Sequence, residues 1–250
     1  MSGRPVLARV LSTAMMAAAI GLTFGTIGLE SLVSGGANAP SVGFALTFLA
    51  LISGLTIMGT VICWRRPGHP IGWLFIVAGL LSAASIFGGT YADLSIAGGG
   101  NLPGTALAAW ISSWAFMPNL GILAVFVPLL FPTGRFLTRR WAWFGLLALV
   151  LGLISVLAIA FGPGPLDSEP GLTNPFGLPA LQPIFAALAP LGDLSAPIGF
   201  GGALLSIFLR YRRGSAVERR QLRLFLFPMA VAIPALVLSI PNNGPLADLG

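Results

Sequence analysis

Long apolar stretches alternate with short polar segments along almost the whole chain. Each apolar stretch is close to the roughly 20 residues that a helix needs to cross the hydrocarbon core of a bilayer. The pattern predicts seven spanning helices, at residues 10–29, 42–63, 71–91, 106–131, 141–161, 191–209 and 224–240. The expected fold class is therefore an all-α integral membrane protein, with residues 1–250 as a single polytopic membrane domain and no soluble catalytic domain.

Proline interrupts three of these stretches. It stands in the fourth, sixth and seventh, at Pro118, Pro128, Pro197, Pro228 and Pro234. Proline is tolerated in a membrane helix where neighbours satisfy the freed carbonyl group, and it usually marks a kink. Residues 179–190 are also apolar but are broken by proline, so we expect them to lead into the sixth helix along the membrane interface.

The composition agrees with a membrane protein. Of the 250 residues, 56% are hydrophobic and 8% are charged, whereas about a quarter of an ordinary soluble domain is charged. So few charges could not cover a water-exposed surface. Intrinsic disorder is excluded as well, because it requires low hydrophobicity and a high net charge.

All thirteen basic residues are arginines, and they occupy alternate polar segments. They precede the first stretch or follow the second, fourth and sixth: Arg4, Arg9, Arg65, Arg66, Arg135, Arg139, Arg140, Arg210, Arg212, Arg213, Arg219, Arg220 and Arg223. Because positively charged loops remain in the cytoplasm, we predict a cytoplasmic N-terminus and a multi-pass protein of the inner or plasma membrane. A cleaved signal peptide ending near residues 37–39 is the alternative interpretation of the first stretch.

The net charge of +6 would suggest nucleic acid for a soluble chain. Membrane orientation explains the arginines better, so we expect no nucleic-acid partner and an anionic inner leaflet instead, at about 1 kcal/mol for each arginine near the surface. The densest group is the candidate lipid-facing or signal-relay segment: Arg210, Arg212, Arg213, Arg219, Arg220 and Arg223. The alternative is that this group only determines topology.

Two carboxylates are candidate intramembrane polar residues. Glu30 is predicted at the outer end of the first helix, and Asp193 just inside the outer end of the sixth. A charge in hydrocarbon is costly, so either residue could serve transport or proton relay. This is the basis of an alternative function, a small transporter or channel subunit. Both side chains could equally reach the outer interface.

No catalytic, metal or cofactor site is expected. The chain has one histidine, His69 in a proline-rich turn, and one cysteine, Cys63 in an apolar run. One residue of each type cannot make a zinc site or a bis-histidine haem site. We expect a surface turn around His69 and a small buried apolar role for Cys63. Phosphate-binding, zinc-protease and serine-hydrolase motifs are also missing from the sequence.

Three segments at the predicted cytoplasmic ends resemble the amino-terminal membrane region of actinobacterial-type sensor histidine kinases. They are residues 65–74 (RRPGHPIGWL), 130–141 (with LFPTGR and RRW) and 210–223 (with RYRR and ERRQLR). Outer residues 108–110 (AAW) and 174–178 (NPFGL) fit the same family. His69 stands where that family more often has asparagine, and Thr133 replaces a frequent aspartate.

The resemblance implies a membrane-embedded sensory or signal-transducing module of a two-component system. The partners to expect are a kinase or response-regulator output and a second copy of the chain. The 250 residues lack a suitable phosphoacceptor histidine and a nucleotide-binding glycine motif. We therefore expect either the amino-terminal part of a longer kinase or a module whose output lies on a partner. A purely structural membrane subunit remains a third class.

Overall fold

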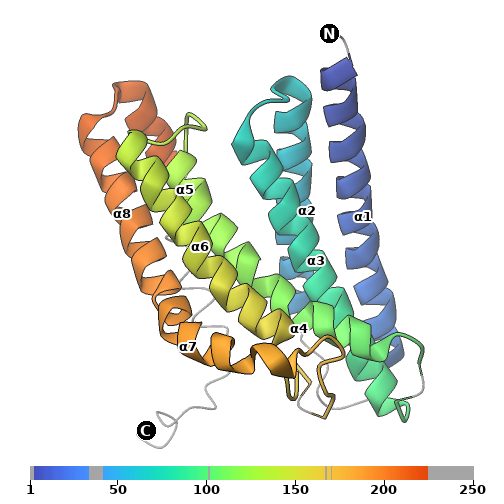
Figure 1. The fold of residues 1–250 in the computed structure, drawn as a ribbon. Helices are drawn as coiled ribbons and strands as arrows, with labels where there is room; N and C mark the ends of the chain where they lie inside the picture. Colours follow the sequence, from blue (N-terminus) through green and yellow to red (C-terminus); the bar gives the residue numbers. More distant parts are fainter. Residues whose placement is uncertain (1–2, 34–41, 101, 167, 170, 225–250) are drawn as a thin grey trace, which may run out of the picture.

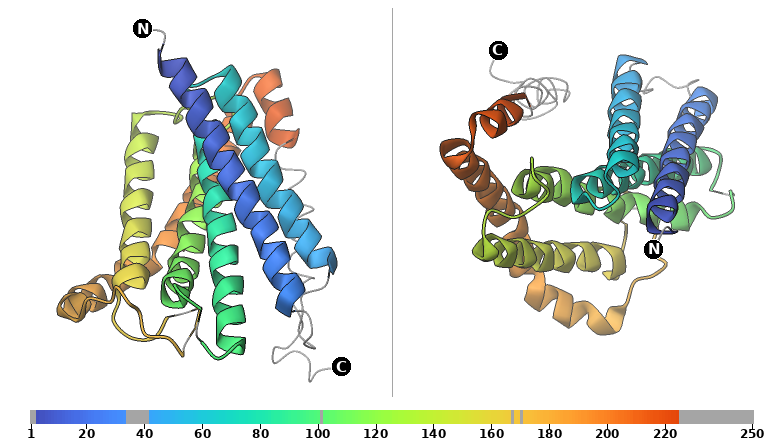
Figure 2. Two further views of the ribbon diagram at one scale, coloured as in Figure 1. Left: turned by 90° about the vertical axis from the view of Figure 1, so that its right-hand side faces the viewer. Right: turned by 90° about the horizontal axis from the view of Figure 1, so that it is seen from above.

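The computed structural model describes residues 3–33, 42–100, 102–166, 168–169 and 171–224, and this part of the chain is an all-helical bundle (Figures 1 and 2). The helices are α1 (Gly3–Val33), α2 (Val42–Arg65), α3 (Pro70–Ala97), α4 (Thr105–Gly121), α5 (Val127–Leu130), α6 (Arg139–Phe161), α7 (Gln182–Asp193) and α8 (Ser195–Arg213). The π-helical turn η1 (Ile122–Phe126) joins α4 to α5, and the 3-10 turn η2 (Pro179–Leu181) precedes α7.

Five helical segments are long and apolar enough to cross a membrane. They are Pro5–Leu32, Pro70–Ala97, Thr105–Leu130, Arg139–Phe161 and Pro179–Arg213. The all-α class and the helices predicted first, third, fourth, fifth and sixth are thereby confirmed as long apolar helices. Helix α2 matches the second predicted stretch, and its segment Leu49–Arg65 is a shorter apolar helix. The predicted seventh helix, residues 224–240, lies almost entirely outside the described residues.

The sixth apolar segment consists of two helices rather than one straight span. Helix α7 ends at Asp193, Leu194 makes a turn, and α8 begins at Ser195. Figure 1 shows α7 running across one end of the bundle and α8 running along it. The predicted start at residue 191 lies near the end of α7, because counting back one bilayer thickness cannot detect this turn. The lead-in predicted at residues 179–190 corresponds to η2 and most of α7, and its course along the membrane interface stays a prediction.

The fourth segment is continuous in spite of its two prolines. Pro118 lies inside α4 and Pro128 lies in the first turn of α5, with η1 between them. At η1 the Val127 N–H donates to the Ile122 carbonyl, which is one residue further back than in an α-helix. A single helical rod therefore runs from Thr105 to Leu130.

Helix α3 packs against α1, α2 and α4 through small residues. A methyl group added at Gly79 would clash with Thr56 of α2, and one added at Gly88 would lie 2.5 Å from the Ala108 carbonyl oxygen of α4. Close backbone approach at small residues is the usual basis of helix association in membranes. Cys63 is fully buried against Gly72, which confirms its predicted small apolar role.

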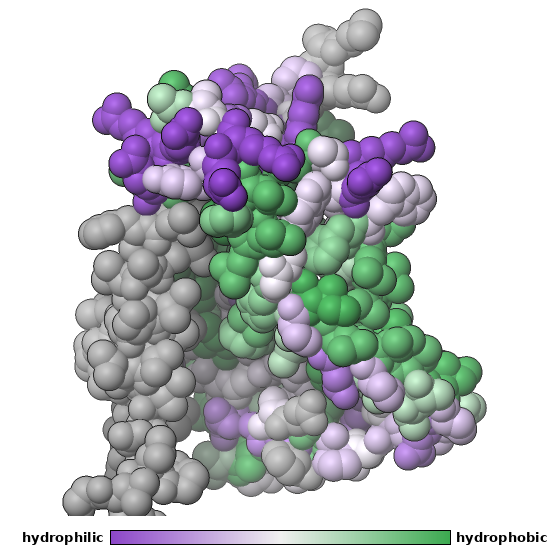
Figure 3. Space-filling view, turned by 90° about the vertical axis from the view of Figure 1, so that its left-hand side faces the viewer, coloured by the Kyte–Doolittle hydropathy of each residue, from purple (hydrophilic) through white to green (hydrophobic). Residues whose placement is uncertain are grey.

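The connections that carry arginine lie at one end of the bundle. The start of α1, the α2–α3 and α5–α6 connections and the end of α8 lie together, and the α3–α4 and α6–α7 connections lie at the opposite end (Figure 1). Figure 3 shows hydrophilic side chains gathered at this end beside a band of apolar side chains. We call it the arginine-rich end. The connections that carry arginine alternate along the sequence with those that carry none, and in the fold the two kinds lie at opposite ends of the bundle.

The glycines of α3 give a direct test of this packing. We predict that Gly88→Ala lowers the free energy of unfolding by about 1–3 kcal/mol, because the new methyl group overpacks the α3–α4 contact. Gly54→Ala in α2 is the matched control. An added methyl group there meets nothing within 4 Å, so it should be neutral or stabilise by up to about 1 kcal/mol through helix propensity. Thermal unfolding in detergent measures both, and equal effects would contradict the packing described.

Candidate functional site

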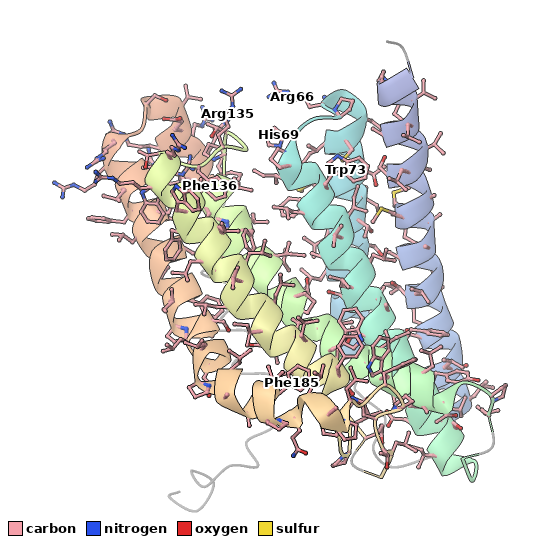
Figure 4. The ribbon with its side chains drawn as sticks, viewed as in Figure 1. Arg66, His69, Trp73, Arg135, Phe136 and Phe185 are labelled. Atoms are coloured by element: carbon pink, nitrogen blue, oxygen red, sulfur yellow. The ribbon has the colours of Figure 1, made fainter. Side chains whose placement is uncertain are left out.

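The α2–α3 turn lies against the α5–α6 loop at the arginine-rich end. A methyl group added at Gly134, whose φ is +73°, would lie 3.0 Å from His69 Nε2. The Trp73 indole N–H donates to the Pro67 carbonyl at 3.0 Å and holds the turn in place. Figure 4 shows His69 on the side of the turn that faces Arg135 and its loop. Residues 65–74 and 130–141, the first two segments on which the sequence resemblance rests, are therefore in contact.

His69 occupies a turn, as predicted, but it faces protein rather than only solvent. Its side chain is half-buried, and its Nδ1 atom is buried with no hydrogen-bond partner. Burial, together with the positive charge of Arg66, lowers the pKa of His69, which favours the neutral imidazole at physiological pH. Sequence reasoning missed this contact because Gly134 is distant in sequence.

Arg210 joins the third kinase-like segment to the second. Its Nη2 atom donates to the Leu129 carbonyl at 2.7 Å and to the Arg135 carbonyl at 2.5 Å. The last carbonyl groups of a helix have no partner within that helix, and Arg210 supplies one at the end of α5. We call His69, Gly134, Arg135 and Arg210 the relay cluster. All three inner segments singled out in the sequence meet in it.

The other five arginines of the predicted relay segment are exposed. They are Arg212, Arg213, Arg219, Arg220 and Arg223. Arg212 lies over the Phe208 ring, 5.7 Å from its centroid. Ser215 and Glu218 each bond to the other's backbone N–H, at 3.2 and 2.9 Å, and this reciprocal cap starts the helical residues 216–224.

Arg210 lies on the buried face of α8. Gly199, Ala203 and Ser206 are the buried residues of this helix, and Arg210 continues that face at the spacing expected of a helix. Arg212 falls on another face, whereas Arg213 follows at the next step of the same spacing but is exposed. Helical spacing therefore separates Arg210 from Arg212 but not from Arg213.

At the opposite end, the loop of residues 162–178 folds onto α4. The Trp110 indole N–H donates to the Ala160 carbonyl at 2.6 Å, and the Trp110 ring lies 4.6 Å from the Phe176 ring, centroid to centroid. The Asn174 side-chain amide donates to the Ala160 and Gly162 carbonyls. Residues 108–110 and 174–178 are therefore also in contact. We call the described residues of 162–178, which leave out 167 and 170, the docked loop.

A pair of carboxyl groups joins the docked loop to α3. Burial and the hydrogen bond and negative charge of Asp93 raise the pKa of Glu169 from its ordinary value of 4.5 to about 7. Two carboxyl groups in contact share one proton, because both cannot be ionised without repulsion. The docked loop therefore carries a contact that titrates near neutral pH.

Asp193 and Glu30 are far apart in the fold. Asp193 is the exposed last residue of α7, and Glu30 is half-buried near the end of α1. The end of α1 and the α7–α8 corner lie on opposite sides of the bundle (Figures 1 and 2). The two predicted polar residues are therefore not parts of one site.

An apolar cavity of about 260 Å³ lies between η1, α6 and α8. Its lining includes Gly121 and Gly152, where an added methyl group would meet nothing within 4 Å. Within the described residues there is no group of three or more histidine, cysteine or acidic side chains that could hold a metal ion. No protein-family model, curated protein or solved structure matches this chain.

The Glu169–Asp93 contact predicts that the docked loop responds to pH. A carboxyl group whose pKa is raised by folding favours the docked state at low pH and loses that contribution as the pH rises from about 4.5 through about 7. We predict that hydrogen-exchange protection of the docked loop, corrected for intrinsic exchange, falls about threefold to fivefold between pH 6 and pH 8. The full pKa shift would give about tenfold over this window, and the partial exposure of Glu169 reduces the effect.

Two variants separate this contact from a general pH effect. Glu169→Gln should remove the pH dependence of protection in the docked loop. Asp193→Asn, which removes an exposed carboxylate on the far side of the bundle, should leave it unchanged. Protection in the unaltered chain that is equal at both pH values would contradict the prediction.

Proposed function

We propose that the chain is a membrane-embedded sensory or signal-transducing module, similar to the amino-terminal region of two-component sensor histidine kinases. In this proposal it spans the inner or plasma membrane seven times with a cytoplasmic N-terminus. It carries no kinase core in these 250 residues and acts on a kinase or response-regulator output. The sequence resemblance and the packing of the kinase-like segments against each other support the proposal.

The proposed orientation rests on the arginine-rich end. Crossing hydrocarbon costs a guanidinium group several kcal/mol, and clustered arginines remain on the cytoplasmic side. The relay cluster then faces the cytoplasm, and the docked loop faces outward. A seventh helix at residues 224–240 would follow the helical residues 216–224.

The contact of Arg210 with the end of α5 carries the functional proposal. The rod from Thr105 to Leu130 bears Trp110, which holds the docked loop, and Leu129, which accepts a hydrogen bond from Arg210. A rigid element that contacts both ends can bias both together if it has two arrangements. A change at the docked loop would then move the end of α8 and the segment that follows it.

Two features of the structure would favour a second packing arrangement of the rod. The rod contains a π-helical turn, η1, and such turns occur often at functional sites. The 260 Å³ cavity beside η1 leaves unfilled space next to α6 and α8, so a shift of helix packing into that space would lose fewer contacts than in a filled core. The proposed signal acts at the docked loop or within the bilayer.

The transporter or channel alternative has no specific observation in its favour. It required Asp193 or Glu30 to line a pathway, and the apolar cavity beside η1 includes neither residue. The sensory proposal therefore remains the better supported of the two.

A chimera tests the proposal. A histidine-kinase core is fused after residue 250 through one added spanning helix, and autophosphorylation is measured in proteoliposomes. Trp110→Ala should release the docked loop and change autophosphorylation severalfold. Combining it with Arg210→Gln should abolish that response, because the end of α8 is then no longer bound to the rod.

The controls match each variant in chemistry. Trp143→Ala removes an exposed indole of α6, and Arg213→Gln removes an exposed guanidinium of α8; neither should alter the response. Thermal unfolding of every chimera checks that the bundle is intact. Kinase activity that is the same in all intact variants would contradict the proposal.

A further inference from the structure

A groove of about 840 Å³ lies between α1 and α2 at the arginine-rich end. It is separate from the relay cluster, and none of its lining residues takes part in the proposed signalling route. One arginine from each helix, Arg9 and Arg65, lines it together with an indole, a hydroxyl group and small apolar side chains. Polar and apolar groups are therefore combined in a single groove.

The polar part of the groove is positively charged. Arg9 and Arg65 are both exposed, and no acidic residue belongs to the lining. Guanidinium groups bind phosphate oxygens through two parallel hydrogen bonds, and arginine is therefore common at phosphate-binding sites. Two arginines on different helices can approach one phosphate group from both sides.

The indole of Trp64 is held in a fixed place within the groove. Its N–H donates to the Thr13 hydroxyl group at 3.2 Å, and that hydroxyl group donates to the Arg9 carbonyl at 2.8 Å. Trp64 is 47% exposed, which leaves much of its surface available. Tryptophan prefers the headgroup level of a bilayer, so this position corresponds to the glycerol and carbonyl region of a lipid.

The apolar part of the groove runs away from the arginines along α1. Ala14 and Ala17 follow Arg9 on the groove side and are exposed. At about 1.5 Å of rise per residue, Ala17 lies roughly 12 Å below Arg9 in the direction of the membrane interior. Their small side chains leave room beside the helix for a hydrocarbon chain.

We propose that this groove binds one anionic phospholipid of the inner leaflet. Its phosphate group lies between Arg9 and Arg65, its glycerol region lies beside Trp64, and one acyl chain follows Ala14 and Ala17. Charge complementarity selects an anionic lipid, since a choline headgroup would bring a cation against the two guanidinium groups. The apolar floor selects a lipid over free phosphate. The proposal requires only that α1 and α2 face the bilayer, so it does not depend on the sensory function.

Lipid titration of the full chain by native mass spectrometry tests the proposal. Phosphatidylglycerol and phosphatidylcholine with the same acyl chains are added separately to the detergent-solubilised protein. The first phosphatidylglycerol should bind about tenfold more tightly than the first phosphatidylcholine. Arg9→Gln/Arg65→Gln should weaken phosphatidylglycerol binding about thirtyfold, as expected from the loss of two arginine–headgroup contacts.

Arg139→Gln/Arg140→Gln is the matched control. It removes two exposed arginines from the same end of the bundle and changes the net charge equally, so binding of the first phosphatidylglycerol should stay within about twofold. Ala14→Leu/Ala17→Leu fills the apolar floor without changing charge and should weaken binding as well. Thermal unfolding without lipid checks that each variant is folded.

Three results would overturn the proposal. Equal binding of phosphatidylcholine would show that the headgroup charge does not matter. Equal loss in the two arginine variants would show non-specific attraction at the whole arginine-rich end. Displacement of phosphatidylglycerol by an equal concentration of inorganic phosphate would show an anion site in which the acyl chain has no part.

Discussion

The exclusion of guanidinium groups from hydrocarbon is the constraint on which the rest of the structure depends. Every arginine is confined to alternate polar segments, and in the proposed orientation the helices cross the apolar layer in alternating directions. That arrangement brings segments widely separated in sequence to the same end of the bundle. The relay cluster and the proposed lipid groove both depend on it, because each joins arginine-bearing segments from different helices.

Because charged residues are confined to the helix ends, the polar side chains there can bind backbone carbonyl groups. Arg210 is half-buried because its helix face is directed inward, and it binds the Leu129 carbonyl at the end of α5 and the Arg135 carbonyl in the loop that follows. Trp110 similarly binds a carbonyl group at the end of α6. Both contacts satisfy backbone groups left open at helix termini. In our account the same two contacts connect the outer loop to the inner segments through the rod from Thr105 to Leu130.

The sequence predicts the apolar helices well, because bilayer thickness imposes their length and the arginines show where they end. It could not predict the turn at Leu194, since hydropathy does not distinguish one long helix from two. The contacts of His69 with Gly134 and of Glu169 with Asp93 were also missed, because each joins distant loops. Its spacing from Ala203 and Ser206 could have separated Arg210 from Arg212 but not from Arg213, and the hydrogen bonds that Arg210 makes required the structure.

The side of the membrane on which each connection lies tests the account most directly. Reporters that are active only in the cytoplasm, or only outside it, can be fused after chosen residues of the full sequence. The account predicts that fusions after residues 67, 135 and 214 report the cytoplasm and that fusions after residues 36, 100, 168 and 245 report the opposite side. A single fusion that reports the side opposite to the predicted one would contradict the account. The connection at that point would then lie on the wrong side of the membrane, and arginines would have to cross the hydrocarbon layer there or in the helices that follow.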